Sequence, residues 1–111
     1  MSDAIAQLRA ICLALPGTHE EITWGHPTFR VGAKMFAACG APPDGVATMS
    51  CKCTKDLQAE ILAGEGYFRP DYVGVHGWLG IRLDGSVPWS EVGVHVRRAW
   101  ALTAPKRLQK G

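Results

Sequence analysis

No apolar run in this chain approaches the roughly 18 residues that a membrane-spanning helix requires. The first apolar stretch is interrupted by Gln7 and Arg9, and no basic segment leads into an apolar signal core at the start of the sequence. We therefore expect no membrane role and predict a cytoplasmic protein.

The sequence has four cysteines but no C-x-x-C pair. Cys39 falls in phase with the apolar positions of its predicted strand, while Cys51 and Cys53 share a strand face with Met49. Such positions are typical of small core residues, since zinc would need converging thiolates or imidazoles. Together with Cys12 in an apolar helix, the pattern favours reduced, buried thiols over disulfides or a metal site.

The sequence also lacks the motifs of common enzyme chemistries. It contains no serine or aspartate in a nucleophile-elbow context and no glycine pattern of a phosphate-binding loop. Glu20 and Glu21 are adjacent on a predicted strand, so they point to opposite faces and cannot act as a paired acid and base. We predict no catalytic residue, no cofactor and no metal, and we favour a binding module over an enzyme.

Charge of one sign is not in large excess, because 12 basic and 10 acidic residues give a net charge of +2. Proteins held to nucleic acid by charge alone carry a larger excess. The distribution is uneven, since no acidic residue follows Glu91. The basic residues beyond it are Arg97, Arg98, Lys106, Arg107 and Lys110. This basic segment indicates either an anion-binding surface or a solvated terminus.

The chain of 111 residues is long enough to bury about two-thirds of its unfolded surface in one core. It shows no repeat, low-complexity tract or linker, so residues 1–111 form a single predicted domain. Helical spacing predicts a helix over residues 3–14, with Ser2 as N-cap and a Pro-Gly pair at its end. Alternation of period two over residues 18–53, broken at glycines and prolines, predicts four antiparallel strands.

Three more elements follow these strands. Residues 55–63 are predicted as a helix capped by Thr54, and residues 78–83 alternate as a fifth strand. Residues 89–104 carry apolar positions at helical spacing, with Ser90 as the predicted cap. The expected fold is therefore α+β: an antiparallel β-sheet with helices packed on one face, in the order helix, four strands, helix, strand, helix.

Residues 66–78 concentrate aromatic rings, an imidazole and a guanidinium on a segment broken by glycines and a proline. Large side chains on such a shaped loop are typical of a recognition surface. The groups that this aromatic loop offers for binding are Tyr67, Arg69, Tyr72, His76 and Trp78. They suit stacking against a planar or anionic ligand such as a nucleotide. The alternative is that the loop folds inward and caps the core.

A second informative stretch, residues 22–32, is predicted as two strands around a tight turn. Trp24 is a candidate core residue, whereas His26 on the turn and Arg30, in phase with Thr28, are poorly explained by core packing. We expect Arg30 on the solvent face of the sheet. An open sheet face would then carry basic and hydroxyl side chains able to contact phosphates: Arg30, Thr48, Ser50, Lys52 and Arg82.

Several motifs occur together along the chain. They are Leu15-Pro16-Gly17, Thr23-Trp24-Gly25-His26-Pro27-Thr28-Phe29-Arg30-Val31, Lys34-Met35-Phe36, Tyr67-Phe68-Arg69-Pro70, His76-Gly77-Trp78 and Ala104-Pro105-Lys106-Arg107-Leu108. In this order they resemble the MmcQ/YjbR family of small bacterial proteins over nearly the whole chain. The resemblance implies a compact α+β fold, similar to the type II secretion chaperone and frataxin-like topology. It also implies DNA binding through a proposed double-wing arrangement of β-hairpins.

Three functions stay open at this point. The first is a DNA-binding module that contacts phosphates through the basic sheet face, Lys34, Lys106 and Arg107, and stacks bases on the aromatic loop. The second is a site for a small anionic metabolite, or an uncharacterised enzyme. Its pocket would gather Trp24, His26, Arg69, Tyr72, His76 and Trp78 around one concavity. The third is a protein-interaction adaptor that uses the same aromatic patch.

Overall fold

The computed structural model describes residues 3–40 and 45–109 of the chain. The predicted cap Ser2, the predicted break between strands at residues 41–44 and the basic residue Lys110 lie outside the described residues. The elements, in chain order, are α1 (Asp3–Leu13), β1 (Thr18–Thr23), β2 (His26–Val31), β3 (Lys34–Gly40), β4 (Thr48–Cys51), α2 (Lys55–Ile61), β5 (Tyr67–Phe68), the 3-10 helix η1 (Val73–His76), β6 (Leu79–Arg82), α3 (Trp89–Thr103) and α4 (Lys106–Gln109).

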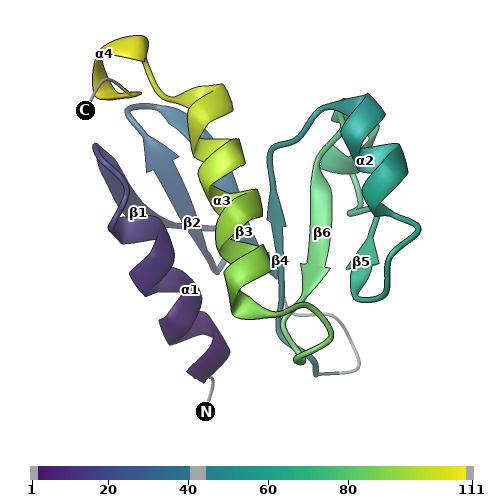
Figure 1. Ribbon diagram of the computed structural model, residues 1–111. Coiled ribbons are helices and arrows are strands. Elements are labelled where there is room, and N and C mark those ends of the chain that lie inside the picture. The colour runs from purple at the N-terminus through teal and green to yellow at the C-terminus, as the bar shows by residue number, and fades with distance from the viewer. Residues whose placement is uncertain (1–2, 41–44, 110–111) are drawn as a thin grey trace.

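Six strands form one antiparallel sheet in the order β1-β2-β3-β4-β6-β5 (Figure 1). The first four are neighbours in sequence as well as in space, so the predicted α+β class and its four-stranded unit are confirmed. β6 pairs with β4 and carries β5 at the edge of the sheet. Tyr67 and Phe68, expected in a loop, are this edge strand, because they pair with Ile81 and Gly80 of β6.

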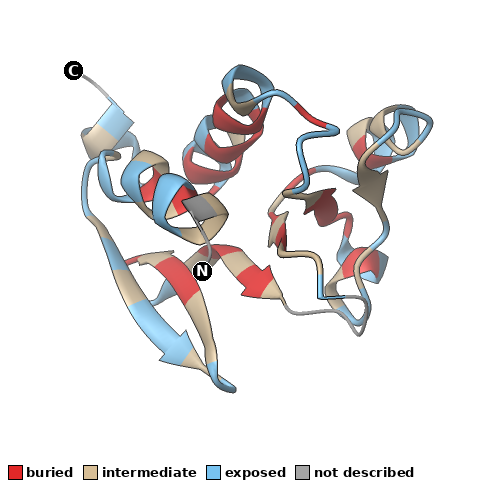
Figure 2. Cartoon of the chain, turned by 90° about the horizontal axis from the view of Figure 1, so that it is seen from below, coloured by how far each residue is buried: buried red, intermediate tan, exposed pale blue. Residues whose placement is uncertain are grey.

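Helices α1 and α3 lie on the same side of the curved sheet (Figure 2), and α3 crosses β3 and β4. The indole Nε1 of Trp100 donates a 2.9 Å hydrogen bond to the carbonyl of Pro16, which fixes the C-terminal part of α3 beside the end of α1. On α2, Leu57 and Ile61 pack against the same apolar core. No helix within the described ranges is long and apolar enough to cross a membrane.

The strand register shows which side chains face the helices. Met49 of β4 lies opposite Cys39 on one side and Ile81 on the other, and Cys51 lies opposite Ala37 and Leu79. These side chains are buried in one cluster, which also contains Cys53. The predicted inward facing of Met49, Cys51 and Cys53 is therefore confirmed.

All four cysteines are free and buried, as the spacing predicted. Burial raises the pKa of the Cys39 thiol to about 11 and that of Cys51 to about 12. Burial also raises the pKa of Cys12. Because the thiolate is the reactive form of cysteine, these side chains are inert packing groups near neutral pH.

The two predicted helix caps that lie within the described residues have different outcomes. The hydroxyl of Thr54 accepts a hydrogen bond from the backbone N–H of Leu57, so the predicted cap of α2 is confirmed. The prediction of Ser90 as the cap of α3 is wrong, since the helix begins at Trp89 and Pro88 occupies the cap position. The extended backbone of Pro88 suits the half-helical position that precedes a first turn.

The turn between β1 and β2 consists of Trp24 and Gly25, with φ angles of 55° and 80°. Two left-handed residues match the twist of a tight hairpin. This turn leaves Trp24 93 % exposed, whereas Phe29 and Val31 on β2 are buried. The interpretation of Trp24 as a core residue is therefore wrong, because the turn projects the indole beyond the sheet.

Candidate functional site

Antiparallel pairing determines which loops meet at each end of the sheet. At one end lie the β2–β3 turn, the end of β4, the start of β6 and the end of β5. The end of α3 and helix α4 join them, because Leu108 lies beside Gly17 at the start of β1. We call this the basic end and define it by its cations: Lys34, Lys52, Lys55, Arg69, Lys106 and Arg107.

The cations of the basic end are largely uncompensated. Asp56 and Asp71 are the carboxylates carried by the same loops and first turns. Ion pairs between described residues involve Arg9, His19, Arg30 and Arg82, and none of the basic-end cations. A surface whose cations have no internal partner is free to attract an external anion.

The opposite end of the sheet has the reverse character. Glu65 precedes β5, Asp84 follows β6, and Glu91 lies in the first turn of α3. The one guanidinium at the end of β6, that of Arg82, lies 3.2 Å from the Asp84 carboxylate. Hydrogen bonds from Ser86, with help from Arg82, lower the pKa of Asp84 to about 2. The charge of the molecule is thus sorted along the strand direction.

An open groove of about 530 Å³ lies at the basic end, between the β2–β3 turn and the junction of α3 with α4. Lys34 and Lys106 stand on its two sides, and Thr103 lies between them. Its apolar lining comes from Val31 and Leu102, and it contains no carboxylate. Two ammonium groups over an apolar floor suit an anion that also has an apolar part.

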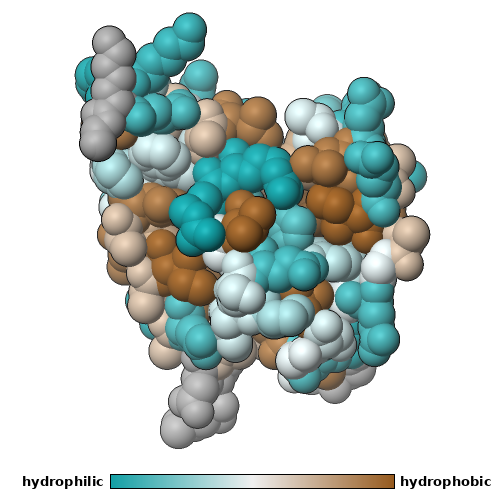
Figure 3. Space-filling view, in the orientation of Figure 1, coloured by the Kyte–Doolittle hydropathy of each residue, from teal (hydrophilic) through white to brown (hydrophobic). Residues whose placement is uncertain are grey.

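The surface of the basic end is hydrophilic where helices α2 and α4 project from it. Figure 3 shows strongly hydrophilic side chains at the two upper corners of the molecule, over α4 on one side and over α2 on the other. Figure 1, in the same orientation, places these two helices at the same end of the strands. The predicted binding residues Lys34, Lys52, Lys106 and Arg107 therefore belong to one end of the molecule, although they come from three separate segments.

The predicted open, basic sheet face differs from what the structure shows. Thr48 is only 7 % exposed, and the two arginines of this face each lie beside a carboxylate. Arg82 lies beside Asp84, and Arg30 Nε lies 3.7 Å from Glu21 Oε1. Their charge is thus offset within the protein, so the face offers less to a phosphate than its residue types suggest.

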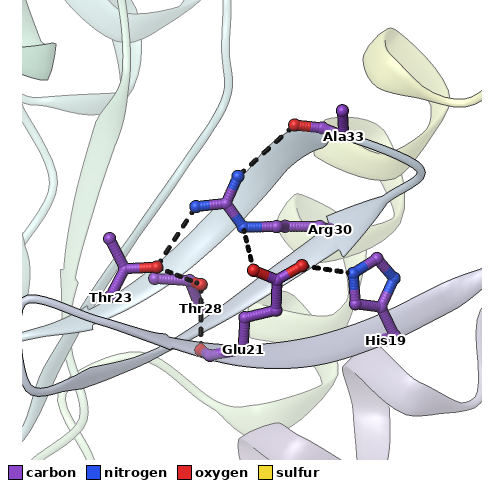
Figure 4. A network of polar contacts seen from close by, with 6 residues as sticks. All are labelled: His19, Glu21, Thr23, Thr28, Arg30 and Ala33. Carbon is purple, nitrogen blue, oxygen red and sulfur yellow. Dashed lines mark hydrogen bonds and ion pairs between the residues drawn. The ribbon is translucent and has the colours of Figure 1, made fainter.

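Figure 4 shows how Arg30 is held on the outer face of the β1–β2 hairpin. Its guanidinium donates to the hydroxyl of Thr23 at 3.1 Å and to the carbonyl of Ala33 at 3.3 Å. Glu21 also contacts His19 Nε2 at 2.7 Å. Glu20, on the other face, pairs with Arg9 of α1. The predicted opposite facing of the two glutamates is confirmed, and both of them act as structural partners of arginines.

The aromatic loop divides into buried and exposed parts. Trp78 is 8 % exposed, and the ring of Phe68 lies directly over Gly80. Tyr72 is 91 % exposed, and Arg69 and His76 are also exposed. The interpretation of Trp78 as a ring face available to a ligand is therefore wrong, because its indole is packed against the rest of the protein. Tyr72 is the ring that the loop presents to solvent.

The predicted pocket shared by His26, Arg69 and His76 is not formed. His26 begins β2, at the end opposite to the basic end, whereas Arg69 follows β5 and His76 precedes β6 at the basic end. β2 and β6 are also separated by β3 and β4. At about 4.8 Å per strand the axes of β2 and β6 lie roughly 14 Å apart, which adds to their separation along the strands.

A partly buried polar chain between α3 and β5 was not predicted from the sequence. Arg98 Nη1 donates to His95 Nδ1 at 2.8 Å, so the His95 proton resides on Nε2 and points at the Tyr67 hydroxyl, also at 2.8 Å. Tyr67 in turn donates to the carboxylate of Glu91. The spacing of Glu91, His95 and Arg98 at one helix face was the available signal.

Burial, reinforced by Arg98, lowers the pKa of His95 below its ordinary value. Burial and the hydrogen bond to Glu91 raise the pKa of Tyr67. Both side chains are therefore neutral near pH 7, and the chain of donors ties β5 to α3. A tyrosine with a raised pKa releases its proton less readily, and a histidine with a lowered pKa accepts one less readily, so this cluster holds the fold together and does not resemble an acid–base pair.

Metal binding finds no support in the geometry. Within the described ranges, no group of three or more histidine, cysteine, aspartate or glutamate side chains is placed to hold a metal ion. The four histidines lie on four different elements, namely β1, β2, η1 and α3. The site that the structure defines is therefore a charged, partly grooved surface at one end of the molecule.

The fold and this surface define the chain as a small α+β domain with a candidate anion-binding end. The family model described as YjbR matches residues 13–102. The chain belongs to the YjbR family, as the sequence motifs indicated. No curated protein matches the chain.

Two solved structures share the fold. A protein of Deinococcus radiodurans, DR2400, with the family-model domain DUF419, is 23 % identical and superposes with a TM-score of 0.77. The match covers 88 % of this chain and 76 % of that one. A protein of Pseudomonas syringae is 17 % identical with a TM-score of 0.76, covering 94 % of this chain and all of the other. Likeness at these identities concerns the fold alone.

Proposed function

We propose that this protein is a non-enzymatic binding module for nucleic acid, with DNA as the leading partner, and that the basic end contacts the phosphates. The observation that carries the proposal is the set of cations without ion-pair partners among the described residues, opposite an acidic end. Phosphate contacts supply most of the affinity in sequence-independent binding. The buried thiols agree with the reducing cytoplasm that we propose as its location.

The dimensions of the basic end suit a backbone of a few nucleotides. Lys34 begins β3 and Arg69 follows β5, and three strand spacings, about 14 Å, separate the two strands. Lys52 and Lys55 follow β4 and lie between them in the sheet order. A net charge of +2 supports only three or four phosphate contacts. We therefore expect weak binding, with a dissociation constant on the order of 10 to 100 µM at physiological salt.

The hairpins are less suited to phosphates than the basic end. The β1–β2 hairpin carries Glu20 and Glu21, and its Arg30 is already engaged by Glu21. A double-wing mode of DNA binding, which the family resemblance implies, remains a prediction. The surface that we propose as the main phosphate contact is the basic end, where α4 and the loops supply the positive charge.

The test is a binding titration on labelled single-stranded and duplex DNA over a salt series. Duplex affinity should fall with a log–log slope of about −0.9 for each phosphate contact. The variant Lys34→Gln/Lys106→Gln should lose affinity and flatten that slope by roughly 0.9 per lysine lost. As a control, Arg97→Gln removes an exposed cation of α3 that does not belong to the basic end. Its guanidinium lies over Gly93, one helical turn nearer to the acidic end of the molecule. Its slope should match that of the wild type.

Salt-independent binding, or no binding of either DNA form at low salt, would remove the nucleic-acid proposal. The second candidate would then be a small anionic ligand in the Lys34–Lys106 groove, because its volume of about 530 Å³ suits such a ligand. Thermal-shift screening of phosphorylated and carboxylated metabolites would detect that ligand through stabilisation of the wild type. The double lysine variant should then show no shift.

A further inference from the structure

Tyr72 combines exposure with an unusual backbone. Its side chain is 91 % exposed, and its φ of 64° lies in the left-handed region. A bulky residue at positive φ is a conformational outlier that costs free energy, and such residues persist where the surrounding structure determines them. Among the described non-glycine residues, Trp24 is the one other case, at the tip of the β1–β2 hairpin.

The segment around Tyr72 is held from inside. The side-chain amide of Gln58, on α2, donates to the carbonyl of Gly74 at 3.0 Å and to that of Trp78 at 2.6 Å. The backbone N–H of Gly74 also donates to Pro70 at 3.0 Å. A buried glutamine that binds one carbonyl within η1 and one just after it fixes the loop against α2. Tyr72 is therefore carried by an ordered scaffold and not by a free loop.

A guanidinium and an imidazole flank the exposed ring on the same segment. Arg69 precedes Tyr72 and His76 follows it, and both are exposed. The Arg69 stem lies on Gly74, where an added Cβ would approach Arg69 Cγ to 2.7 Å. This contact restricts the stem of Arg69 and leaves its head group free of any ion pair between described residues. An exposed ring three residues along the chain from a restrained guanidinium can stack a base while the guanidinium contacts a phosphate.

The other rings of the aromatic loop cannot take this role. Trp78 is buried, Phe68 lies over Gly80, and Tyr67 is engaged by Glu91 and His95. One ring is enough to stack one base, provided that the base is free. Bases inside a duplex are stacked on each other and expose only their edges, whereas those of a single strand expose their faces.

We propose that the nucleic acid bound at the basic end is single-stranded, and that Tyr72 stacks an unpaired base while Arg69 contacts the neighbouring phosphate. This inference rests on the proposed function, because the lysines of the basic end supply the remaining phosphate contacts. Single-stranded nucleic acid is the ligand class that uses an exposed aromatic ring together with a positively charged track.

The experiment compares a labelled oligothymidine of about 12 nucleotides with a duplex of the same length at matched low salt. The wild type should prefer the single strand. Tyr72→Gly should weaken single-strand binding by roughly 5- to 100-fold, the range expected for one stacked base, and leave the salt slope unchanged. Tyr72→Phe should retain the affinity. Trp24→Ala, which removes an equally exposed indole at the opposite end, should also retain it.

Thermal unfolding of the same variants separates binding from folding. Glycine adopts positive φ without a side-chain clash, so Tyr72→Gly should unfold no earlier than Tyr72→Ala. Equal affinity for duplex and single strand, or undiminished single-strand binding by Tyr72→Gly, would overturn this inference and leave the phosphate contacts intact. Absence of any salt-dependent binding would overturn the proposed function as well.

Discussion

The rings of Tyr67 and His95 meet edge to face, with centroids 5.3 Å apart and planes at 86°. This contact joins the edge strand β5 to α3, and the surrounding donors make it a continuous chain from Arg98 to Glu91. β5 has only two residues, so its pairing with β6 alone would anchor it weakly. The polar chain therefore secures the strand from which the aromatic loop departs.

Replacing His95 with Gln should reduce the pH dependence of stability. Burial lowers the pKa of His95 in the folded state, whereas the unfolded chain titrates near the ordinary value of 6.5. Protons bind the unfolded chain first, so the stability present above about pH 6.5 is lost as the pH falls toward the lower folded-state pKa. Melting temperatures at about pH 7.5 and about pH 5.5 should differ more in the wild type than in His95→Gln.

The matched control for this measurement is His76→Gln, which alters an exposed histidine outside the polar chain. Its drop in melting temperature between the two pH values should equal that of the wild type. An identical drop in all three proteins would show that protonation of His95 does not destabilise the fold.

Gln58→Leu should destabilise the protein by about 1–3 kcal/mol, because the carbonyls of Gly74 and Trp78 would lose the donor that serves them in a buried setting. Urea unfolding measures this loss. Gln109→Leu provides the comparison, since Gln109 also donates to two backbone carbonyls but is exposed to water. An equal loss in both variants would contradict a special role for the buried amide.

Met49→Ala should lower the free energy of unfolding by about 2–5 kcal/mol, as expected for a large side chain removed from a packed core. Met49 is 1 % exposed and lies between Cys39 and Ile81. Ser50→Ala, one residue along on the opposite sheet face, should change the stability far less. A loss below about 0.5 kcal/mol for Met49→Ala would mean that β4 is turned the other way.

Gly80→Ala should destabilise the protein through overpacking, by about 1–3 kcal/mol. A Cβ at this position would approach the ring of Phe68 to 2.5 Å. Phe68→Ala removes the obstacle, so the double variant should lose less than the sum of the two single changes. Additive losses in a double-mutant cycle would show that the ring does not rest on Gly80.

Much of the fold could be predicted from the sequence because its signals are local. Alternation over residues 18–53 specified four hairpin-connected strands, and a two-residue turn specified the register of the first pair. The position of β6 beside β4 depends on a crossover through α2, which no local pattern encodes. β5 is too short for its alternation to be visible.

The candidate site was less predictable, because it depends on which segments become neighbours. Residue types marked Lys34, Lys106 and Tyr72 as candidate binding groups, and all three are exposed in the structure. The pairing of Arg30 with Glu21 required knowledge that both face the same side of the hairpin. The burial of Trp78 depends on tertiary packing of the loop, whose backbone Gln58 ties to α2. The predicted pocket around His26 was wrong because sheet order and strand direction separate its members.

Sorting of charge along the strands gives the molecule an electric dipole, with its positive pole at α4 and the aromatic loop. A polyanion exerts a torque on such a dipole before any contact forms, so encounters are biased toward productive orientations. The bound protein would turn its negative pole outward. The bound protein molecules would then line the polyanion with exposed carboxylates. These carboxylates would repel the acidic end of any further protein molecule that approached.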